Sequence, residues 1–419
     1  MTLGMFDIAV VCLVVTAVLA YVNHRFVGLP TTIGVMAIAL LLSLGLIVLD
    51  RLGFGAWRDY EATLLSSIDF SELLMQGMLS LLLFAGALHI DLSQLRDYRW
   101  PVGLLAVLGT AVSTVIVGVA VWWLLPMVGL ELPLAYCLVF GALISPTDPI
   151  AVIGILKSAG APQSVKLVVS GESLFNDGVG VVLFSLLLAV AVKGETPSLG
   201  EGAWLLIHEA GGGLLLGAAL GALMYYMLRS IDNYQVEVLL TLAGVMGGYE
   251  LASHLHVSGP LAMVVAGLIV GNHGRAYAMS DDTRHHIDLF WELIDEILNA
   301  VLFVLLGLEI VLIAFTGQVM LASVGVILIA LLARLLAVGV PVAVLKPVFR
   351  LPDGAWKVLT WGGLRGGISV ALVLSLPQGT ERELLLALTY AVVVFSILVQ
   401  GLSIKGVIVR SLKAPPSAS

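Results

Sequence analysis

Long apolar runs recur along the whole chain, and they constrain the fold more than any other feature of the sequence. A helix that crosses the hydrocarbon core of a bilayer needs about 20 mostly apolar residues. Here 60% of the residues are hydrophobic and 11% are charged, whereas soluble domains have about 25% charged residues. The sequence therefore predicts an all-α polytopic membrane protein embedded in lipid. We expect no separate soluble domain and no nucleic-acid partner.

Thirteen apolar runs are expected to be transmembrane helices. They form a single membrane unit over residues 1–412, and residues 413–419 are expected to be a disordered tail. Two more polar segments with aromatic residues, 54–68 and 281–297, are typical of interfacial helices that lie along the membrane. The predicted spans are 5–22, 27–49, 69–90, 100–125, 132–156, 167–192, 203–228, 236–254, 258–271, 298–314, 319–345, 354–376 and 384–404.

The basic residues predict the orientation of these spans. Of the 20 Lys and Arg residues, fourteen fall on one side of the predicted membrane, four on the other, and Arg334 and Arg365 within spans. Basic residues are enriched in cytoplasmic loops. We therefore expect a cytoplasmic C-terminus and, because the number of spans is odd, an N-terminus outside.

Ionisable residues within the spans are candidates for function, because each costs at least about 2.5 to 3.5 kcal/mol at the bilayer centre. The fifth span contains Asp148, and the sixth contains Glu172 and Asp177. The other such residues are Glu250, Glu309, Arg334 and Arg365.

Two spans carry features that interrupt a helix. Pro146 and Pro149 flank Thr147 and Asp148 in the fifth span, and each proline removes a backbone donor. In the twelfth span, residues 362–367 contain four glycines and one arginine. Interrupted helices at corresponding places in two halves are typical of inverted-repeat transporters. The sequence thus predicts two inverted six-helix repeats with interrupted helices 5 and 12, both shielded from lipid.

The sixth span presents oxygen ligands on one face. Ser173, Asn176 and Asp177 have the spacing i, i+3, i+4 and therefore share a helix face. With Asp148 and Thr147 from the interrupted fifth span, they offer the hard oxygen atoms that a desolvated alkali cation needs. Two nearby carboxylates repel each other, so a proton competes with the cation for one of them. Such competition is sufficient for cation/proton exchange.

Other roles for these charges remain open. Asp148 could instead cap a half-helix. Glu172 and Arg365 are interpreted as a structural ion pair between the sixth and twelfth spans, since neither could remain buried alone. Arg334 is interpreted as an interhelical tie or a lipid-facing side chain rather than a ligand.

Three segments resemble the signatures of the monovalent cation/proton antiporter family of the bacterial NhaP and mammalian Na⁺/H⁺ exchanger type. They are residues 145–152, 171–182 and 362–372. The resemblance implies thirteen helices, a homodimer and elevator-type alternating access. It assigns residues 100–192 and 319–404 to a moving transport part, and residues 5–90 and 203–314 to a dimerisation part.

By motif position, the resemblance makes Asp177 the cation- and proton-binding carboxylate. It makes Asp148, Ser173 and Thr147 the other ligands of Na⁺, and Asn176 the mark of an electroneutral subtype. Li⁺ is expected to be a second substrate, and no cofactor is expected besides the transported ions. The location implied is a bacterial inner membrane, with a role in pH homeostasis.

The chain departs from many bacterial relatives at Ala85, where they have an acidic residue in the third helix. This departure removes an expected ligand or access group of the third helix. The nearest rival function is K⁺/H⁺ exchange by the same fold. A cation channel is disfavoured by the paired carboxylates, and an intramembrane enzyme by the lack of a histidine at helical spacing from Ser173.

Overall fold

A computed structural model describes residues 5–51, 78–148, 150–193, 200, 204, 207–308, 310 and 316–412 of the chain. These residues form helices joined by short connections, without a β-strand among them. The prediction of an all-α protein is confirmed. The predicted interfacial helix 54–68 and the tail 413–419 lie outside the described residues, as does the first part of the predicted span 69–90, up to residue 77.

Among the described residues, eight helical stretches are long and apolar enough to cross a membrane. The count of thirteen crossings and the inverted repeats stay predictions. In chain order, the uninterrupted helical stretches not treated below are α1 (Met5–Val22), η1 (Asn23–Val27), α2 (Thr31–Arg51), α5 (Leu79–Leu88), α6 (Leu92–Leu95), η3 (Arg96–Tyr98), α7 (Arg99–Leu104), η4 (Leu105–Gly109), α8 (Thr110–Met127), α11 (Gln163–Lys193), η5 (Ile207–Gly211), α13 (Gly212–Arg229), α14 (Tyr234–His254), α15 (Gly259–Ile269), η6 (Val270–Gly274), α16 (Arg275–Tyr277), α18 (Gly317–Arg334), η8 (Leu335–Gly339), α19 (Val340–Val344), α20 (Lys346–Phe349), α23 (Thr380–Phe395), η9 (Ser396–Gln400) and α24 (Gly401–Ser411).

Both predicted interruptions are present. The fifth predicted span is divided into α9 (Leu134–Ile144) and α10 (Ile150–Ser158), and the twelfth into α21 (Ala355–Trp361) and α22 (Gly367–Leu374). Residues 145–148 and 362–366 have extended or irregular backbone between these half-helices. The prolines of the first segment and the glycines of the second account for these breaks.

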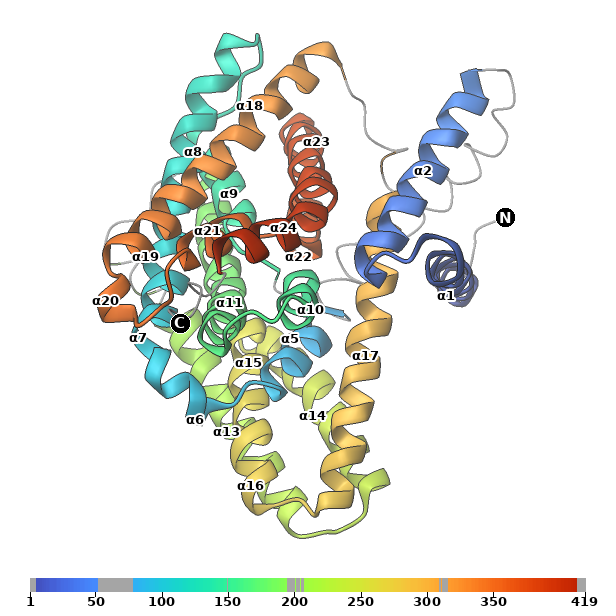
Figure 1. Ribbon diagram of the computed structural model, residues 1–419, viewed down its shortest axis with the longest axis vertical. Helices are drawn as coiled ribbons and strands as arrows, with labels where there is room; N and C mark the ends of the chain where they lie inside the picture. The colour runs from blue at the N-terminus through green and yellow to red at the C-terminus, as the bar shows by residue number, and fades with distance from the viewer. Residues whose placement is uncertain are drawn as a thin grey trace, which may run out of the picture.

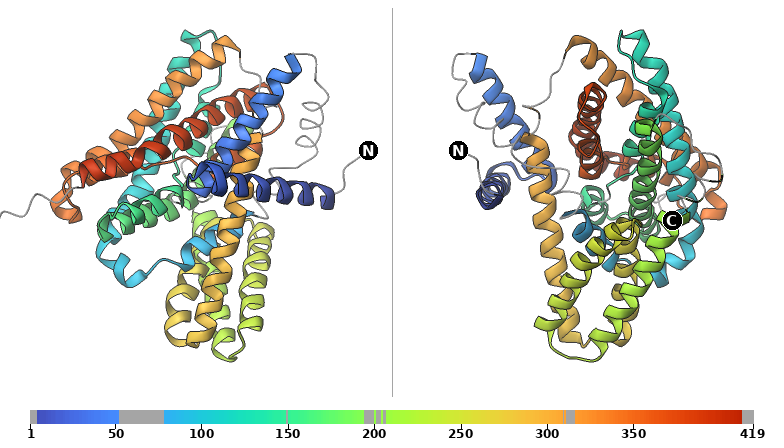
Figure 2. Two further views of the ribbon diagram at one scale, coloured as in Figure 1. Left: turned by 45° about the vertical axis from the view of Figure 1, so that its right-hand side comes forward. Right: turned by 180° about the vertical axis from the view of Figure 1, so that it is seen from behind.

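The predicted interfacial helix 281–297 is wrong as a separate element. Residues 281–308 form one helix, α17 (Asp281–Leu308), which joins the polar segment to the following apolar run. The physical reason is that this stretch contains no proline and no glycine before Gly307, so nothing ends the helix at residue 297. α17 packs along α2 and α5, and it runs along the molecule in Figure 1 and Figure 2.

Side-chain caps define several helix starts. Asn233 accepts hydrogen bonds from the backbone N–H groups of Gln235 and Val236 at the start of α14. Ser258 accepts from Leu261 N at the start of α15, and Thr316 caps α18 in the same way. Each cap satisfies donors that have no partner within the helix.

The long helix α11 lies between two groups of helices. α8, α9, α18 and α23 form the upper group in Figure 1, and α13, α14, α15 and α16 form the lower group. α11 packs against α9 on one side and against α15 on the other. The charged face of the sixth predicted span is therefore held in the interior, next to the first interruption.

Candidate functional site

The two interrupted segments contact each other directly. The backbone N–H of Asp148 in the first segment donates to the carbonyl of Leu364 in the second, at 2.8 Å. In return, the guanidinium of Arg365 donates to the carbonyls of Ser145 and Pro146, the latter at 2.8 Å. Backbone groups that lose their helical partners at one break thus find partners in the other segment. We call this contact between residues 145–148 and 362–366 the crossing.

The second segment is also held from η9. The backbone N–H of Arg365 donates to the hydroxyl of Ser396 at 2.9 Å. The side-chain amide of Gln400 donates to the carbonyl of Trp361, at the end of α21, at 3.0 Å. Five-residue π-helical turns such as η9 are frequent at functional sites. This one fixes both ends of the glycine-rich break.

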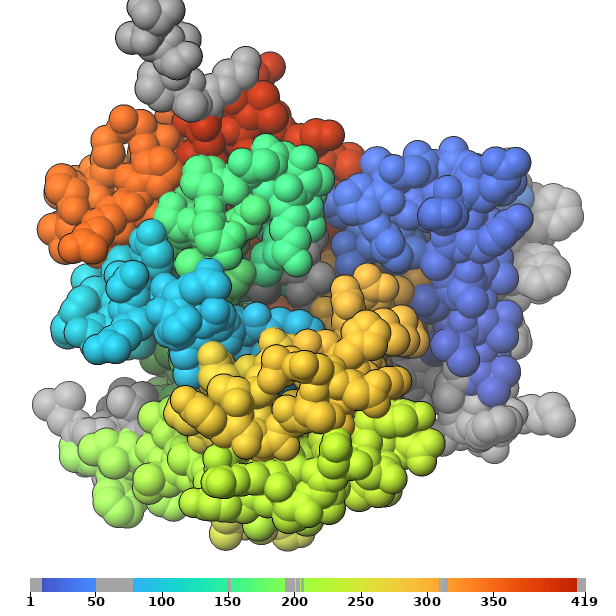
Figure 3. Space-filling view, turned by 60° about the horizontal axis from the view of Figure 1, so that its bottom comes forward, coloured from blue at the N-terminus to red at the C-terminus, as the bar shows by residue number. Residues whose placement is uncertain are grey.

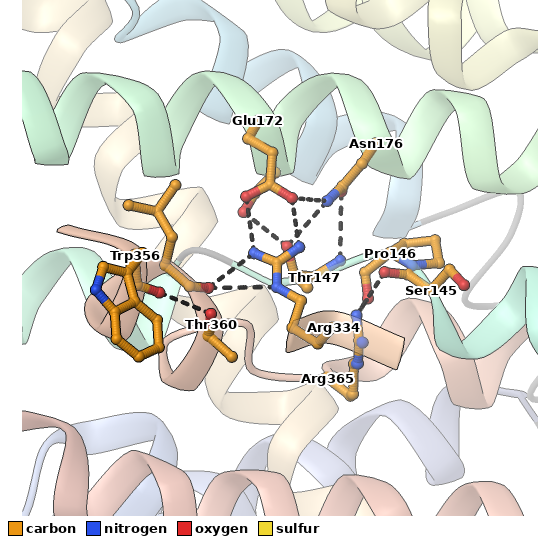
Figure 4. Close-up of polar contacts among 11 residues, drawn as sticks. Ser145, Pro146, Thr147, Glu172, Asn176, Arg334, Trp356, Thr360 and Arg365 are labelled. Carbon is orange, nitrogen blue, oxygen red and sulfur yellow. Dashed lines mark hydrogen bonds and ion pairs between the residues drawn. The ribbon is translucent and has the colours of Figure 1, made fainter. Parts of the chain in front are cut away.

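Three predicted ligands form one buried hydrogen-bond group. The hydroxyls of Thr147 and Ser173 lie 3.0 Å apart, and Asn176 Nδ2 donates to Thr147 Oγ1 at 2.9 Å. Asn176 Oδ1 accepts from the backbone N–H of Thr147 at 3.3 Å. All three side chains are at most 2% exposed, and Figure 4 shows Asn176 reaching Thr147 from α11. The structure therefore fixes Thr147 against the polar face of α11.

The predicted ion pair of Glu172 with Arg365 is wrong in its partner. Glu172 binds Arg334 of α18 instead, with two parallel contacts of 2.5 and 2.8 Å between the carboxylate oxygens and the guanidinium nitrogens. Figure 4 shows Glu172 facing the guanidinium of Arg334, while the neighbouring Arg365 points to Ser145 and Pro146. Arg365 is engaged by backbone carbonyls, so α18 supplies the cation that faces Glu172. The interpretation of Arg334 as an interhelical tie fits this arrangement.

Arg334 also binds the end of a half-helix. Its Nε and Nη2 atoms donate to the carbonyl of Leu359 in α21, at 3.3 and 3.1 Å. Arg334 and Glu172 are 6% and 1% exposed. A buried pair with this bidentate geometry satisfies most of its own polar atoms, which is what makes burial of both charges tolerable.

Asp177 lies close to other negative charges and lacks a donor. It is 5% exposed, and the charges of Asp148 and Glu172 both act on it. Within the described part of the chain, no side chain or backbone group donates a hydrogen bond to its carboxylate. Asp148 itself is half-buried, and its backbone N–H binds the carbonyl of Leu364. The structure brings the two predicted acidic ligands into electrostatic contact around one small region.

Two glycines of the second segment allow the close packing. A Cβ atom at Gly366 would lie 2.4 Å from Oδ2 of Asp148, and one at Gly363 would lie 2.5 Å from Nε of Arg334. Both positions therefore exclude any larger residue unless a charged side chain moves. The glycines place the second segment against an acidic group on one side and a basic group on the other.

The remaining charged residues of the spans lie elsewhere. The Glu250 side chain is 61% exposed and lies 3.4 Å from His254, so it takes no part in this group. Glu309 lies outside the described residues. Ala85 is fully buried in α5. The role of Arg334 as partner of Glu172 was missed, and its place within an apolar span was the only sequence signal for it.

The chain matches the family model described as "Sodium/hydrogen exchanger, transmembrane" over residues 13–410. It is 53% identical to the Na⁺/H⁺ antiporter NhaP of Pseudomonas aeruginosa over 415 residues, which are 98% of this chain and 97% of that protein. It is 39% identical to the Na⁺/H⁺ antiporter NhaH of Halobacillus dabanensis, over 84% of this chain and 86% of that one. Among solved structures, the sodium/proton antiporter MjNhaP1 of Methanocaldococcus jannaschii has the same fold, with a TM-score of 0.75, 18% identity and coverage of 96% and 97%.

Proposed function

Because this chain belongs to the sodium/hydrogen exchanger family, a family of multi-pass secondary transporters and not of enzymes, we propose that it exchanges Na⁺ for H⁺ at Asp177. Li⁺ is a second substrate in this proposal. The cation ligands are Asp177, Asp148 and the hydroxyls of Ser173 and Thr147. Asn176 holds Thr147 in place through its amide.

The surroundings of Asp177 carry the proposal. Its carboxylate is buried, feels the charges of Asp148 and Glu172, and receives no hydrogen bond from the described residues. A buried anion without a donor is stabilised by either a bound cation or a proton. Since both would occupy the same carboxylate, binding of one displaces the other, which couples their movements.

The balance of charge around the crossing supports electroneutral exchange. Three carboxylates, Glu172, Asp148 and Asp177, lie close to two guanidinium groups, Arg334 and Arg365. With all five ionised, three negative and two positive charges leave one negative charge. One monovalent cation or one proton neutralises it, so both loaded forms cross the membrane with the same charge. Exchange of one cation for one proton then moves no net charge.

The proposal also covers how the protein moves during transport and how its subunits assemble. Residues 100–192 and 319–404 form the transport part, which moves as an elevator against the dimerisation part, residues 5–90 and 203–314. The protein is a homodimer in a bacterial inner membrane, with its C-terminus in the cytoplasm, and it serves pH homeostasis. Cross-linking of the protein in native membranes tests the dimer, and a monomer as the only species would contradict it.

The test of the transport function uses purified protein in liposomes with an acidic interior and a pH-sensitive dye. Na⁺, Li⁺, K⁺ or choline is added outside while the membrane potential is clamped. We expect Na⁺ and Li⁺ each to dissipate the pH gradient, at a rate that does not depend on the clamped potential. Dissipation mainly by K⁺ would instead make the protein a K⁺/H⁺ exchanger, and dependence on the potential would contradict electroneutrality.

Asp177→Asn removes the shared carboxylate and should abolish this response. The matched control is Asp281→Asn, which makes the same chemical change at a side chain that is 98% exposed, and it should exchange like the wild type. Folding of both variants is checked by size-exclusion chromatography. Sodium-dependent proton movement retained by folded Asp177→Asn protein would overturn the assignment.

A further inference from the structure

A cavity of about 370 Å³ lies between three helices that are distant in sequence. The start of α2, the second half-helix α10 and the middle of α17 surround it, and Figure 3 shows these elements around a recess on one face of the molecule. The lining residues that bear polar side chains are Thr31, Thr32, Ser158, Asp295, Glu296 and Asn299.

Asp295 is held in a fixed position in this cavity. Asn299, one turn further along α17 and 1% exposed, donates from Nδ2 to the carboxylate of Asp295 at 3.1 Å. The same Nδ2 donates to the backbone carbonyl of Asp295 at 2.7 Å. Because the amide is buried and doubly engaged, the carboxylate of Asp295 has a restricted orientation.

The cavity is connected electrostatically to the crossing of the interrupted segments. The charge of Asp148 acts on Asp295, and α10, which lines the cavity, begins two residues after Asp148. Asp295 thus lines the cavity and is also close enough to Asp148 for the two charges to interact.

The lining attracts cations and contains nothing that repels them. It has two carboxylates and hydroxyl and amide groups, but no Lys, Arg or His. Among the described residues, no cationic side chain forms an ion pair with Asp295 or Glu296. A concave surface with one sign of charge and low-dielectric walls raises the local concentration of counter-ions.

We propose that Asp295 is an entry residue of the transport path, which gathers the monovalent cation in this cavity before it reaches Asp148 and Asp177. Asn299 is the positioning residue that keeps the carboxylate turned into the cavity. This inference rests on the proposed exchange function, and with the predicted orientation the cavity opens to the cytoplasm. It adds a third carboxylate, from a different part of the molecule, to the two at the crossing.

The test compares wild type with Asp295→Asn and Asp295→Glu in sealed membrane vesicles of both orientations, with the sodium KM measured on each face. For Asp295→Asn we expect the KM to rise roughly 3- to 10-fold at low ionic strength on the face with the cavity, while the maximal rate stays within about twofold, since the carboxylates at the crossing are intact. At an ionic strength of about 0.3 M the increase should shrink to less than about twofold, because salt that enters the open cavity screens the charge of its carboxylates. Asp295→Glu should restore the wild-type KM.

The matched control is Asp282→Asn, which makes the same chemical change at a side chain that is 74% exposed, near the start of the same helix and outside the cavity lining. It should leave the KM unchanged. Glu296→Gln gives a second variant of the lining and should raise the KM in the same salt-dependent way. An unchanged KM for Asp295→Asn on both faces, or a reduced maximal rate with the KM unchanged, would overturn the inference. A wild type without sodium-dependent proton movement would instead overturn the exchange function itself.

Discussion

The two half-helices that end at the interruptions are capped by arginines in different electrostatic situations. Arg365 binds the carbonyls of Ser145 and Pro146 after α9, and Arg334 binds the carbonyl of Leu359 in α21. A cation is favourable at a helix C-terminus, where the helix dipole is negative. Arg334 is also neutralised by Glu172, whereas no carboxylate of the described residues forms an ion pair with Arg365.

This difference separates a structural role from a transport role. Arg334 and Glu172 form an ion pair, called the closed pair below, and Glu172 Oε1 also accepts a hydrogen bond from Asn176 Nδ2 at 3.1 Å. Arg365 instead holds the carbonyls of Ser145 and Pro146, which directly precede the predicted ligand Thr147. We infer that changes at the closed pair mainly affect folding, and that changes at Arg365 and its neighbours mainly affect ion binding.

The largest expected effect is at the closed pair. Glu172→Gln and Arg334→Gln should each destabilise the protein by about 3–5 kcal/mol, because each leaves the other charge buried without a partner. The double variant should lose less stability than the sum of the singles. Thermal unfolding in detergent, with all four proteins compared, measures this coupling. Additive losses would show that the two residues do not form a pair.

A smaller effect on stability, with a larger effect on transport, is expected for Arg365→Lys. Lysine keeps the charge but lacks the planar fork that reaches two carbonyls. The free energy of unfolding should fall by about 1–3 kcal/mol, the cost of an unsatisfied buried polar group. The sodium KM and the maximal rate of exchange should both change. Normal transport with reduced stability would show that Arg365 acts only as a helix cap.

Gly366→Ala tests the contact between the second segment and Asp148. The added methyl would lie 2.4 Å from Oδ2 of Asp148, so the carboxylate must move from its present position. We expect the sodium KM to rise about tenfold, a loss of about 1.4 kcal/mol of binding free energy, with little loss of folded protein. Gly406→Ala is the control, since a methyl there meets no atom within 4 Å. An unchanged KM for Gly366→Ala would argue against Asp148 as a ligand.

The smallest effect on stability is expected at an exposed helix cap, Asp91. It provides the reference for the two buried caps, Arg334 and Arg365. Asp91 caps α6 and accepts hydrogen bonds from Ser93 and Gln94. The hydroxyl of Ser93, more than any other group, lowers the pKa of the Asp91 carboxyl. Its contribution is therefore present above the unfolded pKa of about 3.9 and is lost as the pH falls through the lower folded value.

Asp91→Asn should accordingly lower the unfolding temperature slightly at neutral pH, and the difference from wild type should change as Asp91 is protonated at acid pH. The unfolding temperature measured between pH 3 and pH 7 tests this. A difference that stays constant over this range would show that the charge of Asp91 does not contribute.

Much of the fold and part of the site could be predicted from residue patterns. The prolines at 146 and 149 and the glycines at 362–367 predicted both interruptions, because the backbone effects of these residues are local. The spacing of Ser173, Asn176 and Asp177 predicted a polar face on the sixth span, since helical periodicity is local as well. The prediction of a separate helix over 281–297 is wrong, because polarity alone does not end a helix and this segment contains neither proline nor glycine.

By itself, the sequence determined the membrane class, the places where helices are interrupted and the residues that bear charge within the membrane. Only the tertiary structure decided which of these charges meet. Two buried arginines were available as partners of Glu172. Arg334 of α18 binds it, whereas Arg365 donates to the carbonyls of the first interruption. The position of Asp295 at a cavity beside α10 was decided in the same way. Pairing of charges over such sequence separations depends on the packing of whole helices, which local composition does not encode.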